Sequence, residues 1–522
     1  MVMTTSSSSA DCQVLVVGAG PTGLTLAVQL LARGIRTRII DKHAAPLPYS
    51  RALGLQARTL ELLDTMGLAE AFIDAGHQVH GLRMYSGRRT LVRLAFAHNG
   101  SRFSYVLHLP QQETENLLRA RFIELGGTVE RGIELVGFSA NECGVDVKLR
   151  DAVGHTTETS VDYVVGCDGA NSRVRHDLGL PFVGQPYPQD WLLADVELDG
   201  VGSDDAVHLF FRPNGLPLSC IPMGGRRWRV VMPNSGDRGG APPTFEEIQE
   251  LVAQRAPWSL TMSDPTWLSC FRSQLRAATS YRRGRVLLAG DAAHVHSPAG
   301  GQGMNTGMLD ADNLAWKLAL VADGRASDGL LDTYEQERIP VASGVLGFTD
   351  KLVGLLTMRH PVKRAVRDTL LPAATALPVV QRRAAGRLSQ TSVAYLPGPL
   401  VRPDDIRREP KPGQRCTDVD VRTHSGTARL HHVLRHGRHV LLLSPNDVGT
   451  GLASNSFERF AGLVEVVEAD LGPAFTLVRP DGVVAVRGSR HETGRIVDYL
   501  RQLCWADDGT PEPALALAGG PP

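Results

Sequence analysis

Three glycines near the amino terminus are spaced for binding a phosphate group. Gly18, Gly20 and Gly23 form a GxGxxG pattern between an apolar strand and an amphipathic helix that ends near Gly34. A glycine turn in this context lets backbone amides and the helix dipole approach a pyrophosphate closely. Thr22 lies inside the same turn. The pattern predicts a dinucleotide site, the alternative being a tight turn of purely structural use.

A carboxylate stands at the end of the second predicted strand. Asp41 follows the glycines at a distance of about 20 residues, where an acidic side chain can accept hydrogen bonds from the ribose hydroxyls of adenosine. Lys42 comes next in the chain and is included in the predicted cofactor site. NAD and FAD sites share these features, so this half of the site does not separate the two cofactors.

A second motif, VLLAGDAAHVHSPAGGQGMN, distinguishes an FAD site from an NAD site. It places Asp291 at a strand end and a glycine-rich loop before a helix that runs from about Met304 to Ala322. An NAD dehydrogenase needs no such element. We expect Asp291 to bind a ribityl hydroxyl, and the amides of Gly303, Met304 and Asn305 to face the flavin N1 and C2 carbonyl. A helix N-terminus stabilises a nearby anion, such as reduced flavin, by roughly 0.3–2 kcal/mol. The motif predicts FAD, the alternative being a capping aspartate beside a structural turn.

Three separated motifs together resemble the class A flavoprotein aromatic hydroxylases, the family of para-hydroxybenzoate hydroxylase and phenol hydroxylase. The motifs are GAGPTG at 18–23, VVGCDGANSRVR at 164–175 and GDAAHVHSPAGGQGMN at 290–305, and the resemblance covers about residues 11–390. It implies that the central motif serves both FAD and NAD(P)H. The residues that the resemblance adds to the site are Asp168, Ser172, Arg175, Arg51 and Gln111, with Gln112 as the rival of Gln111.

The resemblance also implies a reaction. NADPH or NADH reduces the flavin, O2 adds to give a C4a-hydroperoxide, and an electron-rich ring carbon of a small aromatic substrate takes the distal oxygen. The alternatives are Baeyer–Villiger or antibiotic-inactivating oxygenation, a flavin dehydrogenase without oxygenation, and a non-catalytic FAD-binding protein. The catalytic side chains stay unknown; the candidates are Arg51, His208, Arg212 and Pro298. Ser297 replaces a proline that is frequent in the family, which puts substrate contacts from this loop in doubt.

Short alternating stretches between 181 and 276 predict antiparallel strands that cover the substrate. In AVHLFFR, one face carries Val207, Leu209 and Phe211, and the other His208, Phe210 and Arg212, without indicating which face meets a ligand. The proposed pocket walls are Trp191, Phe210, Ile221 and Met223, for which ordinary core packing is the alternative.

The C-terminal part resembles the thioredoxin-like domain of the aromatic polyketide hydroxylases. PGQRCTD at 412–418 and LVRPDGVVAVR at 477–487 carry this resemblance, which favours a large, multi-ring phenolic or quinone-like substrate over a simple benzoate. The chain has no CxxC pair, so we expect the domain to be structural or oligomeric, consistent with a homodimer.

The predicted fold is α/β: a Rossmann-like FAD-binding domain with an inserted antiparallel β-sheet substrate domain and a C-terminal thioredoxin-like α/β domain. The expected boundaries are a disordered tail at 1–10, the first FAD-binding part at 11–180 with a substrate-side excursion at about 75–108, the β domain at 181–276, the second FAD-binding part and helical region at 277–395, a linker at 396–412 and the last domain at 413–522.

Composition excludes several functions. Lysine plus arginine equals aspartate plus glutamate, at 55 each, so the chain has no net basic field for nucleic acid or a membrane surface. No long apolar run and no leader pattern are seen. Seven scattered cysteines fit a reducing cytoplasm. His294 and His296 lack further ligands of the right spacing, so we expect no metal site and a packing role for His294.

Overall fold

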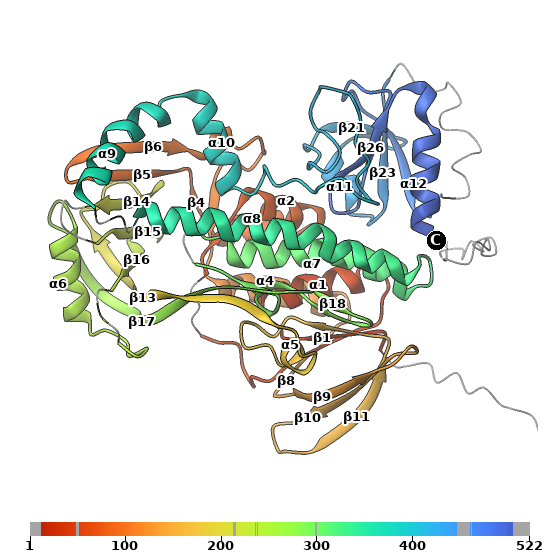
Figure 1. Ribbon diagram of the computed structural model, residues 1–522, viewed down its shortest axis with the longest axis horizontal. Coiled ribbons are helices and arrows are strands. Elements are labelled where there is room, and N and C mark those ends of the chain that lie inside the picture. Colours follow the sequence, from red (N-terminus) through yellow and green to blue (C-terminus); the bar gives the residue numbers. More distant parts are fainter. Residues whose placement is uncertain are drawn as a thin grey trace, which may run out of the picture. The chain divides into compact units, whose positions relative to one another are not determined.

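The computed structural model (Figure 1) describes residues 12–48, 52–211, 216–234, 236, 238–297, 300–356, 358, 360–445, 460 and 462–504. The predicted tail at 1–10 and the candidate residues Arg51, Arg212 and Pro298 lie outside this part of the chain. The described residues form two compact units, divided at 312/313, 338/339 and 393/394.

A six-stranded sheet in the order β18-β19-β12-β1-β2-β8 organises the first unit. All its pairs are parallel except β18 with β19. Parallel strands covered on both faces are continuously apolar, as VLVV in β1 is. The carboxyl ends of β1, β2, β12 and β19 therefore meet at one edge. The strands are β1 (Val14–Val17), β2 (Thr37–Asp41), β8 (Val129–Arg131), β12 (Tyr163–Gly166), β18 (Arg282–Arg283) and β19 (Val286–Leu288).

An eight-stranded sheet in the order β20-β17-β13-β16-β15-β14-β5-β6 forms the rest of the framework of this unit. Its pairs are antiparallel except β14 with β5. Segment 81–95 thus joins the inserted strands. The strands are β5 (Gly81–Ser86), β6 (Arg89–Ala95), β13 (Phe182–Asp199), β14 (Ala206–Phe211), β15 (Leu218–Gly224), β16 (Arg227–Pro233), β17 (Thr261–Ala278) and β20 (His294–Val295).

Both faces of β14 are buried. Phe210 packs with Ile248 and Val252 of helix α6 (Phe245–Arg255). Leu209 and Phe211 pack on the opposite face, against residues that include Leu371 of α9 (Pro361–Thr375) and Leu388 of α10 (Pro378–Leu388). The alternation in AVHLFFR therefore divides two packed faces and does not mark a free one.

Small sheets and helices complete the first unit. Helix α7 (Gly303–Ala322) begins where the sequence predicts it, and it continues into the second unit. The remaining elements are β3 (Gly54–Leu55), β4 (His77–Val79), β7 (Val106–His108), β9 (Glu134–Ala140), β10 (Val145–Arg150), β11 (Thr156–Val161), α1 (Pro21–Leu31), α2 (Ala57–Thr65), α3 (Ala69–Ala75), α4 (Gln111–Glu124), α5 (Arg173–Asp177) and most of α8 (Asp332–Leu356).

The second unit contains a six-stranded mixed sheet in the order β22-β21-β24-β23-β25-β26. Within it β23 is parallel to β24 and antiparallel to β25, and α12 follows β26, which is a thioredoxin-like arrangement. The predicted fold class is confirmed. The elements are β21 (Asp420–Thr423), β22 (Gly426–Arg429), β23 (His439–Leu443), β24 (Val464–Glu468), β25 (Phe475–Val478), β26 (Val484–Gly488), α11 (Leu430–Leu434) and α12 (Gly494–Cys504).

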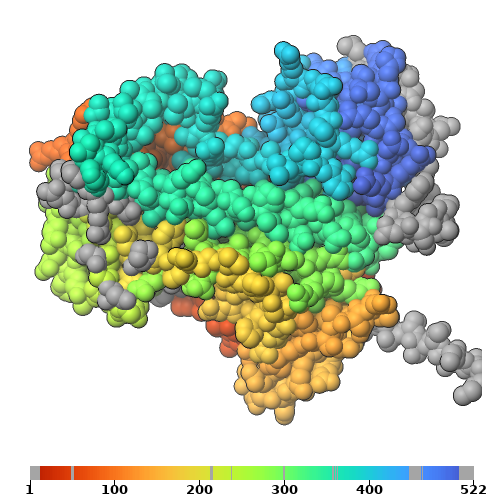
Figure 2. All heavy atoms as spheres, in the orientation of Figure 1, coloured from red at the N-terminus to blue at the C-terminus, as the bar shows by residue number. Residues whose placement is uncertain are grey.

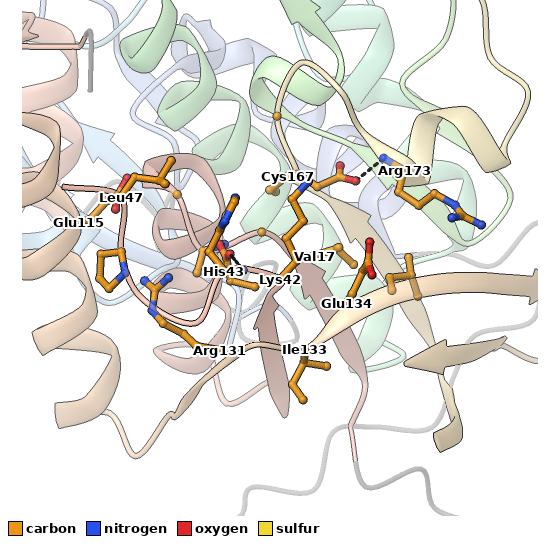
Figure 3. Close-up of a pocket in the computed structure, with 18 of the residues that line it drawn as sticks. Val17, Lys42, His43, Leu47, Glu115, Arg131, Ile133, Glu134, Cys167 and Arg173 are labelled. Atoms are coloured by element: carbon orange, nitrogen blue, oxygen red, sulfur yellow. Dashed lines mark hydrogen bonds between the residues drawn. The ribbon is translucent and has the colours of Figure 1, made fainter. Parts of the chain in front are cut away.

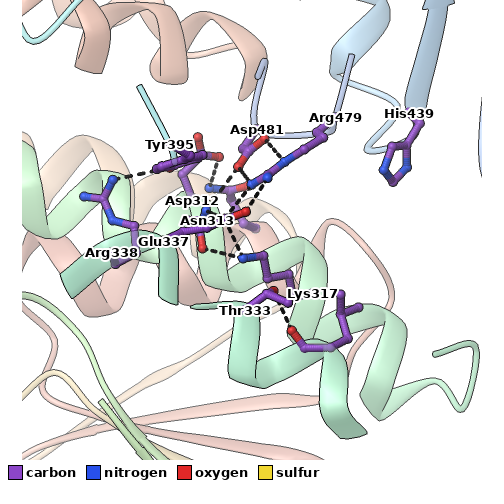
Figure 4. Close-up of polar contacts among 12 residues, drawn as sticks. Asp312, Asn313, Lys317, Thr333, Glu337, Arg338, Tyr395, His439, Arg479 and Asp481 are labelled. Atoms are coloured by element: carbon purple, nitrogen blue, oxygen red, sulfur yellow. Dashed lines mark hydrogen bonds and ion pairs between the residues drawn. The ribbon is translucent and has the colours of Figure 1, made fainter. Parts of the chain in front are cut away.

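A buried ion network lies inside this second unit (Figure 4). Glu337 accepts hydrogen bonds from Lys317 Nζ (2.8 Å) and from Arg479 (2.6 and 2.9 Å), and Arg479 also pairs with Asp481. Burial lowers the pKa of Lys317 to about 8. Burial alone would raise the pKa of Glu337, but the charges of Arg479 and Lys317 hold it below its usual range. The RPDG turn at 479–482 thus binds two helices, since Arg479 pairs with Glu337 of α8 and Asp481 accepts from Asn313 of α7 at 3.3 Å.

Candidate cofactor site

A pocket of about 220 Å³ opens at the carboxyl edge of β1, β2 and β12 (Figure 3). In this view, Leu47, Glu115 and Arg131 lie on one side and Cys167 and Arg173 on the other. Six residues that the sequence assigns to the cofactor line it: Gly18, Gly20, Asp41, Lys42, Gln111 and Asp168. Segments far apart in the chain thus meet where a ligand of the parallel sheet is expected.

The three glycines of the first motif are needed for different reasons. Gly18 has φ +105°, and a Cβ atom there would collide with the carbonyl oxygen of Cys167. A Cβ on Gly23 would collide with the carbonyl of Gly18. A Cβ on Gly20 would meet nothing within 4 Å, so open space lies above it. Gly20 is also the N-cap of α1 and offers no capping side chain, so the amides of Thr22 and Gly23, which follow Pro21, are available to an anion.

Asp41 is fixed by the backbone around it. Its Oδ2 accepts from the amide of Ala19 at 2.9 Å, and its Oδ1 accepts from the amide of His43 at 2.8 Å. A carboxylate can accept about four hydrogen bonds, so two backbone donors leave capacity for the hydroxyls of a ligand. Lys42 follows and is exposed.

Gln111 occupies the first position of α4 and donates to Glu115 Oε1 at 2.8 Å. Burial raises the pKa of Glu115. Glu115 was not among the predicted site residues, although its position one helical turn after Gln111 could have indicated it. Arg131 was missed as well; it stands opposite Asp41 in the pairing of β2 with β8. Gln111, and not its neighbour Gln112, is the residue that lines the pocket.

Asp168 uses only one of its two oxygens. Oδ2 accepts from the amides of Arg173 (2.6 Å) and Val174 (3.2 Å), at the start of α5. Oδ1 is buried and has no hydrogen-bond partner. Burial raises the pKa of Asp168. An unsatisfied buried acceptor beside a pocket is explained by a donor that a ligand brings.

Ser172 and Arg175 serve the loop around Asp168. Ser172 Oγ accepts from the amide of Arg175 and so caps α5. The Arg175 guanidinium donates to the carbonyls of Ala170 and Ala292, each at 2.8 Å, and stacks on Phe182. Arg175 therefore ties the second motif to the third.

The third motif lies against the first. Gly290 has φ +63°, and a Cβ there would lie 2.5 Å from Thr22 Oγ1. A Cβ atom on Gly307 of α7 would collide with the same oxygen. Thr22 thus packs between motifs and is not among the residues that line the pocket, whereas Asp291, just after Gly290, is exposed.

The start of α7 is held by Asn305. Its side chain is fully buried, accepts from the amide of Gln56 and donates to the carbonyls of Gly54 and Gly301, each at 2.8 Å. Only its backbone amide can therefore face a flavin. Gly303 and Met304 precede it and are partly exposed.

Comparison with known proteins identifies this architecture. A protein-family model described as FAD binding domain matches residues 11–349. A second family model, described as aromatic-ring hydroxylase, C-terminal, matches residues 409–506. The chain is an FAD-binding aromatic-ring hydroxylase. It is 36% identical over 539 residues to a 6-methylpretetramide 4-monooxygenase from Streptomyces rimosus, covering 98% of this chain and 96% of the relative.

Two further proteins are similar to this hydroxylase. A rifampicin monooxygenase from Streptomyces venezuelae is 37% identical over 481 residues, which cover 91% of this chain and 95% of the relative. The structure of an anhydrotetracycline hydroxylase from Streptomyces rimosus matches with a TM-score of 0.80 and 33% identity, over 94% of this chain and 99% of that one. The predicted family, FAD dependence and aromatic monooxygenase activity are thereby confirmed.

The hydroxylase's own residues fit FAD. The open space over Gly20 and the uncapped N-terminus of α1 suit a pyrophosphate, and the orphan Oδ1 of Asp168 calls for a donor. Thr22 joins this half to the N-terminus of α7. None of the helices in the described ranges is long and apolar enough to cross a membrane.

Two histidines that the sequence singled out make hydrogen bonds and ring contacts within the protein. His294 pairs with Asp310 at 2.7 Å, and Asp310 also accepts from the amide of Gly290; His294 thus has the packing role that we expected. His208 lies on the α6 face, where its Nε2 donates to the Ser203 carbonyl (2.9 Å) and its ring stacks on Tyr85. Burial lowers the pKa of His208. It is not among the residues of the pocket, and the other catalytic candidates lie outside the described residues.

Proposed function

We propose that this hydroxylase inserts one oxygen atom of O2 into a polycyclic aromatic compound of the polyketide type, using FAD that NADPH or NADH reduces. The observation that carries the substrate class is the similarity, along nearly the whole chain, to a 6-methylpretetramide 4-monooxygenase. The match to an anhydrotetracycline hydroxylase structure supports the same class. The presence of the aromatic-ring hydroxylase C-terminal domain agrees with it.

The substrate face of the eight-stranded sheet is the one opposite α6. Trp191, Leu193 and Phe271 cluster on it, with Trp267 packed alongside. Arg229 and Asp195 form a buried, two-pronged ion pair there, with both bonds at 2.8 Å. Flat aromatic walls beside a neutralised pair suit a flat, polar-edged ring system. Of the four proposed wall residues, Phe210 packs under α6 instead, because odd and even positions of β14 face opposite sides.

A chain of contacts links this sheet to the start of α7. Asn305 donates to the carbonyl of Gly54, Gly54 pairs with His108 across β3 and β7, and His108 Nδ1 donates to the carbonyl of Pro222 at 2.6 Å. Pro222 lies between Ile221 and Met223, the two proposed wall residues of β15. This supports a substrate position between the sheet and the N-terminus of α7.

The protein's part in the reaction is to hold the cofactor and the substrate and to shield them from water. FAD, when bound, supplies the acceptance of hydride from NAD(P)H and the activation of O2. The amides of Gly303, Met304 and Asn305 stabilise negative charge at the helix N-terminus, and the sheet face orients the ring and excludes water. His208 is committed to packing, so we assign no general base.

We propose that Asp41 binds the adenosine ribose of FAD and that Asp291 binds its ribityl chain. Asp168, in the loop of the central motif, also binds the cofactor. The test is Asp291→Ala. Because Asp291 is exposed, the variant should fold but purify without flavin absorbance. Asp323→Ala, at another exposed position, is the control. Wild-type FAD occupancy in Asp291→Ala would remove this residue from the site.

The function itself is tested by a substrate panel. Polycyclic polyketide phenols, simple phenols and benzoates are each incubated with the FAD-loaded enzyme, NADPH or NADH, and O2. We expect NAD(P)H consumption coupled to a hydroxylated product with the polycyclic phenols alone. Coupled turnover of simple benzoates only would contradict the proposed class.

A second candidate is oxidation of a finished antibiotic, which the 37% identity to a rifampicin monooxygenase favours. The panel therefore includes rifampicin. Products that carry the new oxygen in an ester or lactone would indicate Baeyer–Villiger insertion. We also propose a cytoplasmic setting, because NAD(P)H is available there and all seven cysteines are free thiols.

A further inference from the structure

Helix α9 turns apolar side chains toward solvent. Val362, Val366 and Leu370 are 64, 51 and 61% exposed, and their spacing of four residues puts them on one face of the helix. Leu377, just after the helix, is 54% exposed. Single exposed aliphatic residues are common, but an aligned row is not explained in that way. We call these four residues the α9 stripe. Figure 2 shows segment 361–388, in teal at the upper left, on the surface of the molecule.

The stripe is not the face that anchors the helix. Arg367 is buried and stacks over Phe211 at 4.4 Å. Asp368 accepts from Ser86 Oγ at 2.6 Å, and Leu371 packs into the core cluster of β5, β6 and β14. Residues 367, 368 and 371 thus dock α9 on the sheet, so the stripe is an additional apolar surface.

The charge around the stripe has one sign. Segment 361–388 contains six basic residues and a single acid, Asp368, which is bonded to Ser86 and Arg367. The exposed charged side chains of the segment are all basic: Lys363, Arg382, Arg383 and Arg387. A chain that is neutral as a whole therefore carries a local cationic and apolar surface, which whole-chain charge counting cannot detect.

We propose that α9 and α10 dock on the surface of an anionic lipid bilayer. A helix with an apolar row flanked by Lys and Arg binds in the plane of such an interface, through buried apolar area plus attraction to anionic headgroups. A second copy of the chain fits less well, because a symmetric contact would set these cations against one another. Polycyclic substrates partition into lipid, so docking brings the enzyme to them; that benefit rests on the proposed function, whereas the docking does not.

The experiment is flotation of the full-length, FAD-loaded enzyme with vesicles of phosphatidylcholine alone or mixed equally with phosphatidylglycerol. We expect the enzyme to float with the anionic vesicles only, and less so at high salt. Arg382→Glu/Arg383→Glu should weaken binding by about 30-fold or more. Val366→Glu/Leu370→Glu should abolish it. Val153 is 79% exposed in the turn between β10 and β11, far from α9 in the sequence. Val153→Glu is therefore the matched control and should float like the wild type.

Each variant is first checked for wild-type flavin absorbance and thermal midpoint, and the two double variants test the proposal independently of each other. Wild-type enzyme that stays at the bottom with both kinds of vesicle overturns the proposal. So does flotation that neither double variant changes. If the stripe instead mediates self-association, or captures an acidic protein without binding lipid, the bilayer is not its partner.

Discussion

Thr22 Oγ1 lies 2.5 Å from the point where a Cβ atom on Gly290 would stand. The first and third motifs of the cofactor site therefore touch, although most of the first unit separates them in the sequence. A Cβ atom on Gly307 would collide with the same oxygen, so Thr22 packs against glycines of both the third motif and α7.

We expect Gly290→Ala to weaken FAD binding strongly. The substitution combines strain at φ +63° with a collision against Thr22, and overpacking of this kind costs about 1–3 kcal/mol. Gly284→Ala is the matched control, because Gly284 has φ +58° but open space around it. FAD affinity is measured by flavin fluorescence titration. Adding Thr22→Ala to Gly290→Ala should recover part of the loss; equal affinity in the two glycine variants would contradict the contact.

Asp168→Asn should lower FAD affinity by roughly 10-fold or more while leaving the fold intact. The amide oxygen can still accept from Arg173 and Val174, but an NH2 replaces the orphan acceptor Oδ1, and a hydrogen bond to a charged group contributes about 1.5–3 kcal/mol. Asp199→Asn changes an exposed carboxylate that does not line the pocket and serves as the control. Unchanged affinity in Asp168→Asn would show that Oδ1 meets no donor of the cofactor.

Lys317→Met should destabilise the second unit by about 3–5 kcal/mol, since it leaves Glu337 buried with one cation fewer. Lys351→Met, at an exposed position of α8, should change stability by less than about 0.5 kcal/mol. Urea unfolding of both variants, followed by far-UV circular dichroism, measures the difference. Equal urea midpoints for the two variants would mean that the buried ion network makes no net contribution to the free energy of unfolding.

Stability should fall as the pH drops below about 6.5. Burial lowers the pKa of His439 to about 3 and of His108 to about 4, so the unfolded chain binds protons at these histidines before the folded one does. Each such group then costs about 2 kcal/mol between pH 7 and pH 5. His439→Gln should flatten the dependence, and His155→Gln, at an exposed site, should leave it unchanged. A stability curve that is flat from pH 7 to 5 would contradict the buried neutral histidines.

The motifs were predictable because their chemistry demands particular residues at the ends of particular strands. Gly18, Gly20, Asp41 and Asp168 line one pocket since parallel strands end at the same edge. Such positions are set by local geometry that the sequence expresses directly.

Other features depend on contacts that no local pattern encodes. The alternation of side chains along β14 predicts two faces, but it does not predict that α6 covers one face and that α9 and α10 cover the other. His208 became a catalytic candidate because this packing could not be predicted. The backbone amide of Asn305 was predicted to face the flavin, but no pattern predicts that its side chain binds Gly54 and Gln56, which lie about 250 positions earlier in the chain. Thr22 likewise belongs to packing between motifs.

Labelled oxygen tests the central claim most directly. The FAD-loaded enzyme, NADPH and a polycyclic phenol that supports coupled turnover are incubated under ¹⁸O2, and the product is examined by mass spectrometry. We predict one ¹⁸O atom per product molecule, in a new ring hydroxyl, for each NADPH consumed. Product oxygen that comes from water, product that forms without O2, or ¹⁸O found in a lactone would contradict aromatic hydroxylation.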